Sequence, residues 1–248
     1  MSAIYILWLR QVKRYFRARA RILASLGQPL LFLLALGFGL GPIFKKAGGG
    51  DYIQFLAPGV IGMTILFTAI FSGIELIWDR QFGFLKETLV APVPRLMIMI
   101  GRTLGGATVA IVQGLIVVVI CLIAGFRPGA LGGMPLAFVF MALIAIMFTA
   151  LGTAIASVLS DFQGFQFVMN FLVMPIFFLS GALFPLVGLP KLLNFIAAID
   201  PLSYGVDGLR GTLGGGFHFG ASVDLAVLCV LTAALLWLGS YLFSRIQL

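Results

Sequence analysis

The sequence predicts an all-α integral membrane protein with six transmembrane helices. Hydrophobic residues make up 61% of the 248 residues and charged residues only 10%, whereas soluble domains carry roughly 25% charged residues. Apolar runs long enough to span a bilayer, which takes about 20 residues each, occur six times and use most of the chain. A separate soluble catalytic domain is therefore not expected.

We assign residues 1–21 to an N-terminal interface segment, in which residues 4–21 form an amphipathic helix. One face carries the cations Arg10, Lys13, Arg14, Arg17 and Arg21, and the opposite face carries Ile4, Trp8, Val12, Tyr15 and Phe16. Arg19 falls on the apolar side, so the pattern weakens near its end. A signal peptide is the alternative, but the next apolar run is too long and no cleavage site precedes Lys45.

Residues 22–248 are predicted to form a single transmembrane domain. Its spans cover approximately residues 22–44, 55–78, 96–124, 136–159, 165–184 and 223–243. Pro29 is expected to kink the first span. Gly101 and Gly105 lie four residues apart in the third span, a spacing that permits close helix contact.

The stretch at residues 78–95 separates two apolar runs but carries five charged residues, which exclude it from hydrocarbon. A helix over residues 82–90 would place Lys86 and Glu87 on one side and Phe82, Leu85 and Leu89 on another. Pro92 and Pro94 would end it before the third span. Such a helix beside the bilayer suits docking into a groove of another protein. A simple interfacial loop is the alternative.

Residues 185–222 form the longest stretch between spans and are half apolar. Two helix-like pieces, at residues 189–198 and 204–213, are separated by a break at Asp200-Pro201. We expect short re-entrant or interfacial helices that fold back into the edge of the membrane.

The distribution of Lys and Arg predicts that both termini are cytoplasmic. With this orientation eleven of the 16 Lys and Arg residues lie inside and five outside, as the positive-inside rule requires. The 78–95 stretch is then cytoplasmic and the 185–222 stretch external. Six cations lie within the first 21 residues, beside a span, which is typical of lipid headgroup contact rather than of nucleic acid binding.

Few residues could carry chemistry, and we predict no catalytic and no metal site. No Lys follows a Gly anywhere, so a phosphate-binding P-loop is excluded. Glu75 lies one turn before the end of the second span, where an acid is a functional candidate. It could pair with Arg80 or reach the interface, act on protons or substrate, or pack between subunits. Asp161 is expected to be solvated or to cap a helix.

Three sequence patches resemble the permease subunits of ABC transporters of the type-2 exporter class, the daunorubicin-permease-like group. The patches cover residues 52–211 in order and at the expected spacing. They are Phe55-Leu-Ala-Pro-Gly-Val60; Trp78-Asp-Arg80 through Gly83 and Glu87 to Leu89-Val-Ala-Pro-Val-Pro-Arg95; and Phe178-Leu-Ser-Gly-Ala-Leu-Phe-Pro185, Leu189-Pro190 and Asp200-Pro-Leu-Ser-Tyr204 through Asp207 to Arg210. Many relatives have a longer N-terminal tail, and the polysaccharide branch carries different loop residues, which makes that solute class less expected.

The resemblance implies a complex in a bacterial inner membrane, with two permease copies, identical or similar, and two ATP-binding subunits that hold ATP and Mg. This chain would bind no cofactor itself. A coupling helix within residues 80–92 would contact the ATP-binding subunit through Arg80, Phe82, Gly83, Leu85, Lys86, Glu87, Pro92 and Pro94. The external re-entrant segment would include Pro185, Pro190, Pro201, Tyr204 and Arg210.

The resemblance also implies that the second and fifth spans line the translocation path. The candidates there are Phe67, Phe71, Glu75, Asn170, Phe171, Met174, Phe177 and Phe178. Ordinary packing or lipid-facing surface is the alternative for each aromatic residue.

The predicted function is thus export of a hydrophobic or amphipathic solute, such as a drug, lipid or glycolipid, driven by ATP on a partner subunit. One alternative is a stand-alone proton-coupled secondary transporter that uses Glu75 and Asp161. Another is a membrane scaffold without transport. No internal repeat is visible, which weakens the secondary-transporter hypothesis.

Overall fold

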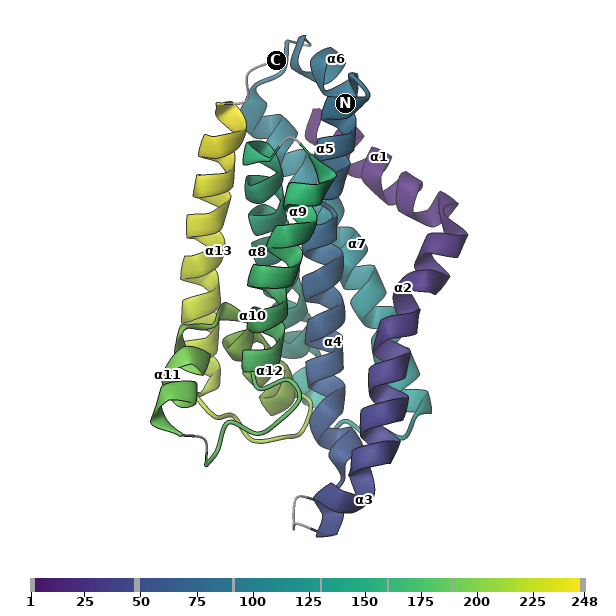
Figure 1. Cartoon of the computed structure of the whole chain (residues 1–248), viewed down its shortest axis with the longest axis vertical. Helices are drawn as coiled ribbons and strands as arrows, with labels where there is room; N and C mark the ends of the chain where they lie inside the picture. The colour runs from purple at the N-terminus through teal and green to yellow at the C-terminus, as the bar shows by residue number, and fades with distance from the viewer. Residues whose placement is uncertain are drawn as a thin grey trace.

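The structure is a computed structural model that describes residues 3–46, 50–90, 92–129, 131–159, 161–188 and 190–245. Every regular element within these ranges is a helix, and six helical segments are long and apolar enough to cross a membrane (Figure 1). The predicted all-α fold with six spans is therefore confirmed.

The helices follow the predicted order along the chain. The first half contains α1 (Ala3–Arg17), α2 (Arg19–Phe32), the π-helix η1 (Leu33–Phe38), α3 (Gly39–Lys46), α4 (Tyr52–Phe71), α5 (Ile74–Gln81), α6 (Phe84–Val90) and α7 (Arg95–Ile123). The second half contains the 3-10 turn η2 (Leu131–Gly133), α8 (Met134–Val158), α9 (Phe162–Val168), the π-helix η3 (Met169–Val173), α10 (Met174–Leu179), α11 (Lys191–Ile199), α12 (Pro201–Thr212) and α13 (Ala221–Ser244).

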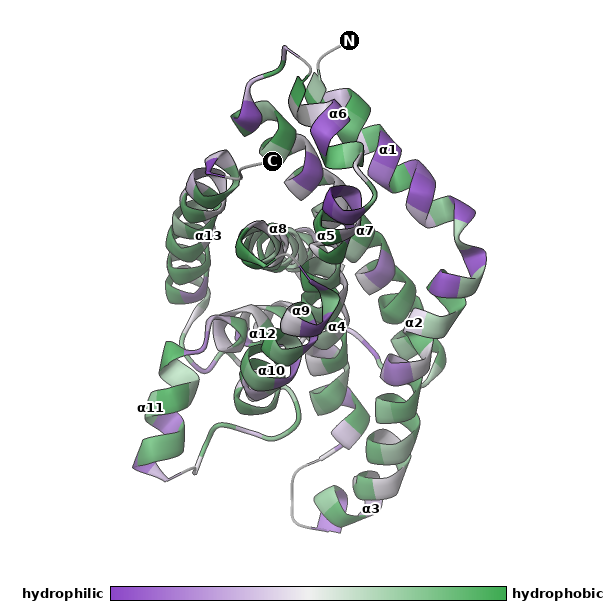
Figure 2. Ribbon diagram, turned by 45° about the horizontal axis from the view of Figure 1, so that its top comes forward, coloured by the Kyte–Doolittle hydropathy of each residue, from purple (hydrophilic) through white to green (hydrophobic). Residues whose placement is uncertain are grey.

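The two ends of the bundle differ in composition. Helix α6 and the outer end of α13 lie at the end of the bundle where α1 begins, and α3 and α11 lie at the opposite end (Figure 1). Apolar residues cover the long helices, whereas polar residues gather along α1 and near α6 (Figure 2). The start of α1 and the end of α13 thus lie on the same side of the bundle, as an even number of spans requires.

Helix α4 is the most enclosed element, and small residues allow its neighbours to approach. A Cβ atom on Gly59 would lie 2.2 Å from the carbonyl oxygen of Ala182, just after α10. At the α4–α5 junction, a Cβ on Gly73 would lie 2.4 Å from the carbonyl oxygen of Gly152 in α8. Side chains at these positions would push α8 and the end of α10 away from the centre.

Helix α1 packs along α7, a contact that amphipathicity alone did not predict. A Cβ on Gly101 would lie 3.0 Å from the carbonyl oxygen of Ile4, and one on Gly105 would lie 2.0 Å from Oε1 of Gln11. The Trp8 indole also donates a hydrogen bond of 3.0 Å to Thr108. The prediction of close contact at Gly101 and Gly105 is confirmed, and the contacting helix is α1.

The N-terminal helix ends earlier than predicted. Its last residue is Arg17 rather than Arg21, because Ala18 leaves helical geometry with φ −91° and ψ 60°. Arg19 and Arg21 therefore belong to α2. This bend explains why Arg19 does not fit the amphipathic pattern of the residues before it.

Two other boundaries follow from local backbone chemistry. The fifth span ends at Leu179 rather than near residue 184, because the chain turns at Gly181, whose φ of +72° is outside the helical region. The predicted break at Asp200-Pro201 is confirmed: α11 ends at Ile199, and the Asp200 carboxylate accepts the Leu202 N–H at 2.9 Å as the N-cap of α12. Leu189 lies outside the described residues.

Candidate functional site

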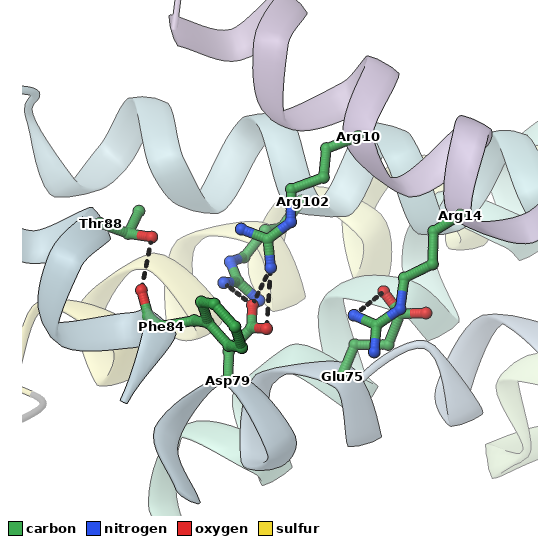
Figure 3. A network of polar contacts seen from close by, with 7 residues as sticks. All are labelled: Arg10, Arg14, Glu75, Asp79, Phe84, Thr88 and Arg102. Carbon is green, nitrogen blue, oxygen red and sulfur yellow. Dashed lines mark hydrogen bonds and ion pairs between the residues drawn. The ribbon is translucent and has the colours of Figure 1, made fainter. Parts of the chain in front are cut away.

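A buried carboxylate joins three helices at the α1 end of the bundle. Asp79, in the last turn of α5, accepts hydrogen bonds of 2.8 and 2.7 Å from Nη2 of Arg10 in α1. Arg102 in α7 donates to the same carboxylate (Figure 3). Both Asp79 and Arg102 are buried. The N-terminal helix, the second span and the third span therefore share one ion-pair network.

Sequence reasoning missed this network. It treated Asp79 as a loop residue and Arg102 as one more cytoplasmic cation. The usable signal was a pair of opposite charges: Asp79 directly follows the apolar run of the second span, and Arg102 is a cation within the apolar run of the third span. Opposite charges at facing ends of antiparallel spans are expected to pair, because an unpaired buried charge is costly.

Glu75 repeats the arrangement one helical turn away. Its carboxylate lies 3.8 Å from Nη1 of Arg14 and 3.6 Å from Nη1 of Arg21. The Arg10 and Arg14 pair on α1 thus matches the Asp79 and Glu75 pair on α5, with the same spacing of four residues (Figure 3). The two helices lie against each other through matched charges.

The expected pairing of Glu75 with Arg80 is wrong. Arg80 instead donates hydrogen bonds of 3.1 Å each to the carbonyl oxygens of Ser157 and Leu159, where α8 ends. Carbonyl groups at a helix C-terminus lack intrahelical partners, so a guanidinium there satisfies two of them. Arg80 fixes the end of the second span to the end of α8.

Helix α6 lies in the predicted coupling region and is largely exposed. Gly83, with φ +81°, separates it from α5, so the helix begins at Phe84 rather than at residue 82. The fully buried Leu85 anchors it, whereas Lys86 and Glu87 are exposed. The expectation that Phe82 shares the face of Leu85 is wrong, because Phe82 precedes the helix and is 73% exposed.

The surface around α6 combines apolar and charged groups. Phe84 and Val90 are exposed together with Phe82. Pro92 and Pro94 are exposed in the short connection to α7. The side chain of Leu89 lies outside the described residues. An exposed apolar patch beside a Lys–Glu pair is typical of a protein contact surface.

A cavity of about 290 Å³ lies between α1, α2, α4, α5 and α7. Three predicted path residues, Phe67, Phe71 and Glu75, line it. Its polar wall includes Gln11, Tyr15, Arg21 and Gln28, and its apolar wall includes Met63 and Val109. The cavity is therefore amphipathic and is lined by residues of a single copy of the chain.

The predicted path residues of the fifth span lie elsewhere. Asn170 is exposed, and Phe171 and Phe178 are 80% and 46% exposed on the outer surface. Phe177 is buried, with ring centroids 5.6 Å from Phe32 and 6.0 Å from Phe67, and Met174 is partly buried. Among the described residues, Phe177 is therefore the one aromatic residue of the fifth span whose ring contacts an aromatic ring of the second span.

Three of the predicted re-entrant residues, Pro201, Tyr204 and Arg210, lie on α12 with a second buried acid at the opposite end. Asp207 in α12 accepts the backbone N–H groups of His218 and Phe219, each at 2.8 Å. Tyr204 packs against the Phe219 ring at 4.8 Å and donates to the Ala198 carbonyl at 2.6 Å. These contacts hold the loop before α13 against α12.

Arg210 closes the same end from the other side. It donates to the Gly181 carbonyl at 3.0 Å and stacks over the Phe55 ring at 4.0 Å. Burial lowers the pKa of Arg210 to about 10, and the nearby Asp207 opposes this shift. Pro201 opens α12, whereas Pro185 and Pro190 are exposed on either side of the preceding turn.

Asp161, the other acid considered for proton transport, is a helix cap. Its exposed carboxylate accepts the Gly164 N–H at 2.6 Å and begins α9. In this structure Asp161 therefore has a structural role at the start of α9.

The chain resembles known transport proteins over most of its length. A family model described as ABC-2 type transporter matches residues 2–213. The chain is 29% identical to nodulation protein J of Rhizobium leguminosarum bv. trifolii over 245 residues, which cover 97% of this chain and 90% of that protein. It is 32% identical to the putative transport permease ycf38 of Pyropia yezoensis over 216 residues, covering 85% of this chain and 73% of that protein.

Proposed function

The chain belongs to the ABC-2 type transporter family, and we propose that it is the membrane subunit of an ATP-driven exporter. The family resemblance predicted from the sequence patches is confirmed. Six apolar helices and the family together identify a multi-pass transmembrane transport permease. Export, the energy source and the solute are the finer steps that we propose here.

A separate ATP-binding subunit supplies the energy in this proposal. The chain contains no P-loop motif to hold a nucleotide. ATP and Mg would therefore be bound by the partner, in two copies, beside two permease chains.

The observation that carries the proposal is the construction of α6. The helix exposes Phe84, Lys86 and Glu87 while Leu85 anchors it from beneath. Just before α6, Arg80 ties the chain to α8, and Asp79 ties it to α1 and α7. A displacement of α6 by a partner would therefore reach α5 directly and α1, α7 and α8 through these short connections.

The solute in this proposal is hydrophobic or amphipathic. The relatives' names state no solute, so the class is inferred from the chain itself. Phe67 and Phe71 line the cavity and Phe177 packs against Phe67, whereas Phe171 and Phe178 are exposed. In a dimer the outward aromatics of two chains could line a shared path whose walls favour apolar solutes.

The proposed location is a bacterial inner membrane with both termini in the cytoplasm. The excess of Lys and Arg at the α1 end supports this orientation. It places α6 on the side where ATP is available.

The competing hypothesis of a proton-coupled secondary transporter finds little support. Glu75 is paired with Arg14 and Arg21, and Asp161 caps a helix. Both acids that this hypothesis requires thus already have structural partners.

Transport in proteoliposomes separates the two mechanisms. The purified complex is reconstituted and tested with fluorescent lipophilic dyes and labelled lipids, under either ATP or a pH gradient. We expect transport with ATP only, and its loss in Glu87→Ala but not in the control Lys45→Ala at the opposite end. Transport that a pH gradient drives without ATP would support the secondary transporter instead.

A further inference from the structure

We propose that the cavity between α2, α4 and α7 binds one membrane phospholipid with an anionic headgroup. The inference goes beyond export, because it concerns binding within a single subunit and requires neither ATP nor transport. It rests on the division of the cavity walls, the charge near its polar end and the position of its opening.

The cavity walls are divided as an amphiphile requires. The charged side chains, Arg21 and Glu75, come from the first turns of α2 and α5 and lie with Tyr15 of α1 at one end. Uncharged polar side chains continue along α2 and α4, including Gln28 and Thr64. Apolar side chains come from the middle of α4 and α7, and include Met63, Phe67 and Val109. A headgroup would lie near the α1–α2 bend, and an acyl chain would extend along α4.

Arg21 and Glu75 line the polar end and balance each other in charge, and Arg14, which lies beside Glu75 outside the lining, adds one positive charge. Arg14 and Arg21 face the single carboxylate of Glu75, at 3.8 and 3.6 Å. These distances exceed hydrogen-bond length, so guanidinium N–H groups remain available to a ligand. A phosphate group suits them, because its oxygens match the paired donors of a guanidinium.

The arrangement of both cations is supported by the surrounding helices. The guanidinium carbons of Arg14 and Arg21 lie 5.8 and 5.9 Å from the centre of the Trp78 ring. Tyr15 donates to Gln113 of α7, which in turn donates to Ser25 of α2 at 2.9 Å. These contacts fix the bend between α1 and α2, and with it the shape of the headgroup end.

The opening of the cavity faces outward along α2. Arg21, Ala24 and Gln28 line the cavity and are also exposed. Helix α2 covers this side of the cavity thinly, since Pro29 is its one buried residue. A lipid could therefore enter sideways from the leaflet on the α1 side, where basic pockets between spans favour anionic headgroups.

The test measures bound lipid by native mass spectrometry. The full chain, with any subunit that co-purifies, is delipidated and titrated with phosphatidylglycerol or phosphatidylcholine of identical acyl chains. We expect one tightly held phosphatidylglycerol per chain and about fivefold weaker retention of phosphatidylcholine. Equal retention of both lipids would overturn the proposal.

Two matched pairs of variants locate the site. Arg21→Gln should reduce phosphatidylglycerol retention about fivefold, whereas Arg17→Gln, outside the cavity, should change it less than about twofold. Ala24→Trp should block the opening and remove the bound lipid, whereas Leu23→Trp, on the exposed side of the same turn, should not. Equal effects within either pair would overturn the assignment to this cavity.

Two controls identify the ligand class and exclude misfolding. Displacement of the lipid by inorganic phosphate at millimolar concentration would overturn the lipid assignment, because the site would then recognise a free anion. Each variant should keep the thermal unfolding temperature of the parent. Export activity is not part of the readout, so failure of the proposed transport function would leave this result unaffected.

Discussion

The two ends of the helix bundle hold their buried carboxylates in different ways. At the α1 end, Asp79 is paired with Arg10 and Arg102, which come from two other helices. At the opposite end, Asp207 accepts two backbone N–H groups from the loop eleven and twelve residues further along the chain. The first arrangement connects distant helices through side chains, and the second holds a local loop.

The difference between the Asp79 and Asp207 arrangements indicates where movement could pass from one helix to another. Charged side chains that join α1, α5 and α7 can change partners while each helix remains intact. The backbone hydrogen bonds to Asp207, in contrast, can break only if the loop that donates them moves away from α12. The α1 end, where α6 is exposed, can thus transmit movement between helices. At the opposite end, the hydrogen bonds to Asp207 hold the loop before α13 in one position.

Removing the charge of Asp79 should produce the largest effect. Asp79→Asn leaves Arg102 buried without a counter-ion, which typically costs about 3–5 kcal/mol. We expect a clear decrease in thermal unfolding temperature in detergent and faster proteolysis at Ala18, where α1 meets α2. Asp51→Asn, at an exposed cap, is the control. Unchanged stability in Asp79→Asn would contradict the bracing role of the network.

Asp207→Ala should produce an intermediate and local effect. It removes the acceptor of the His218 and Phe219 amides, and hydrogen bonds to charged groups contribute about 1.5–3 kcal/mol. Hydrogen exchange should accelerate at these two amides while α1 stays protected. Acceleration in α1 instead would show that the two ends are not independent.

Stability should depend on pH through Asp200. Burial raises the pKa of Asp200 to about 7, while its hydrogen bond from the Leu202 N–H acts in the opposite direction. The pKa of Asp200 in the folded protein therefore lies above its value of about 3.9 in the unfolded chain. The contribution of Asp200 to the free energy of unfolding is then fully present at low pH and is lost as the pH rises through 7.

The variant Asp200→Asn isolates that contribution. An Asn residue still caps α12 but does not ionise. Between pH 5 and pH 8, the unfolding temperature should therefore fall less in Asp200→Asn than in the parent. An identical pH profile for both proteins would exclude Asp200 as the titrating group.

Asp224→Asn should produce the smallest effect. Both oxygens of this fully buried carboxylate lack a hydrogen-bond partner among the described residues. An amide keeps the shape and could donate to the neighbouring Asp207. We expect stability to be unchanged or raised by up to about 1 kcal/mol, as measured by thermal unfolding. A loss comparable to that of Asp79→Asn would remove the contrast between the two ends.

The sequence predicted the fold because hydrocarbon imposes simple rules. Long apolar runs must be helices, and the break at Asp200-Pro201 follows from proline geometry. The pairing of Arg10 with Asp79 could not be read from the sequence. It spans 69 residues and requires α1 to fold back along α7.

The candidate site was predicted only in outline. The position of α6 between Gly83 and Pro92 follows from residue chemistry, whereas the exposure of Phe82 depends on the turn at Gly83. Similarly, Glu75 was recognised as an unusual acid, but its partners Arg14 and Arg21 lie on either side of the bend between α1 and α2. In the sequence, the only sign of that bend was that Arg19 does not fit the amphipathic pattern. The path assignment of Phe171 and Phe178 stays a prediction, since both face away from their own subunit.

Purification of the tagged chain at native expression, in mild detergent, tests the central claim most directly. The account predicts a stoichiometric ATP-binding subunit that is lost when Lys86 and Glu87 on α6 are both reversed in charge. It should be kept when the exposed Lys45 and Lys46 at the opposite end are reversed. Arg80 is left unchanged in this test, because it also holds the end of α8. A chain that elutes intact and alone, or that keeps its partner after reversal on α6, would contradict the account.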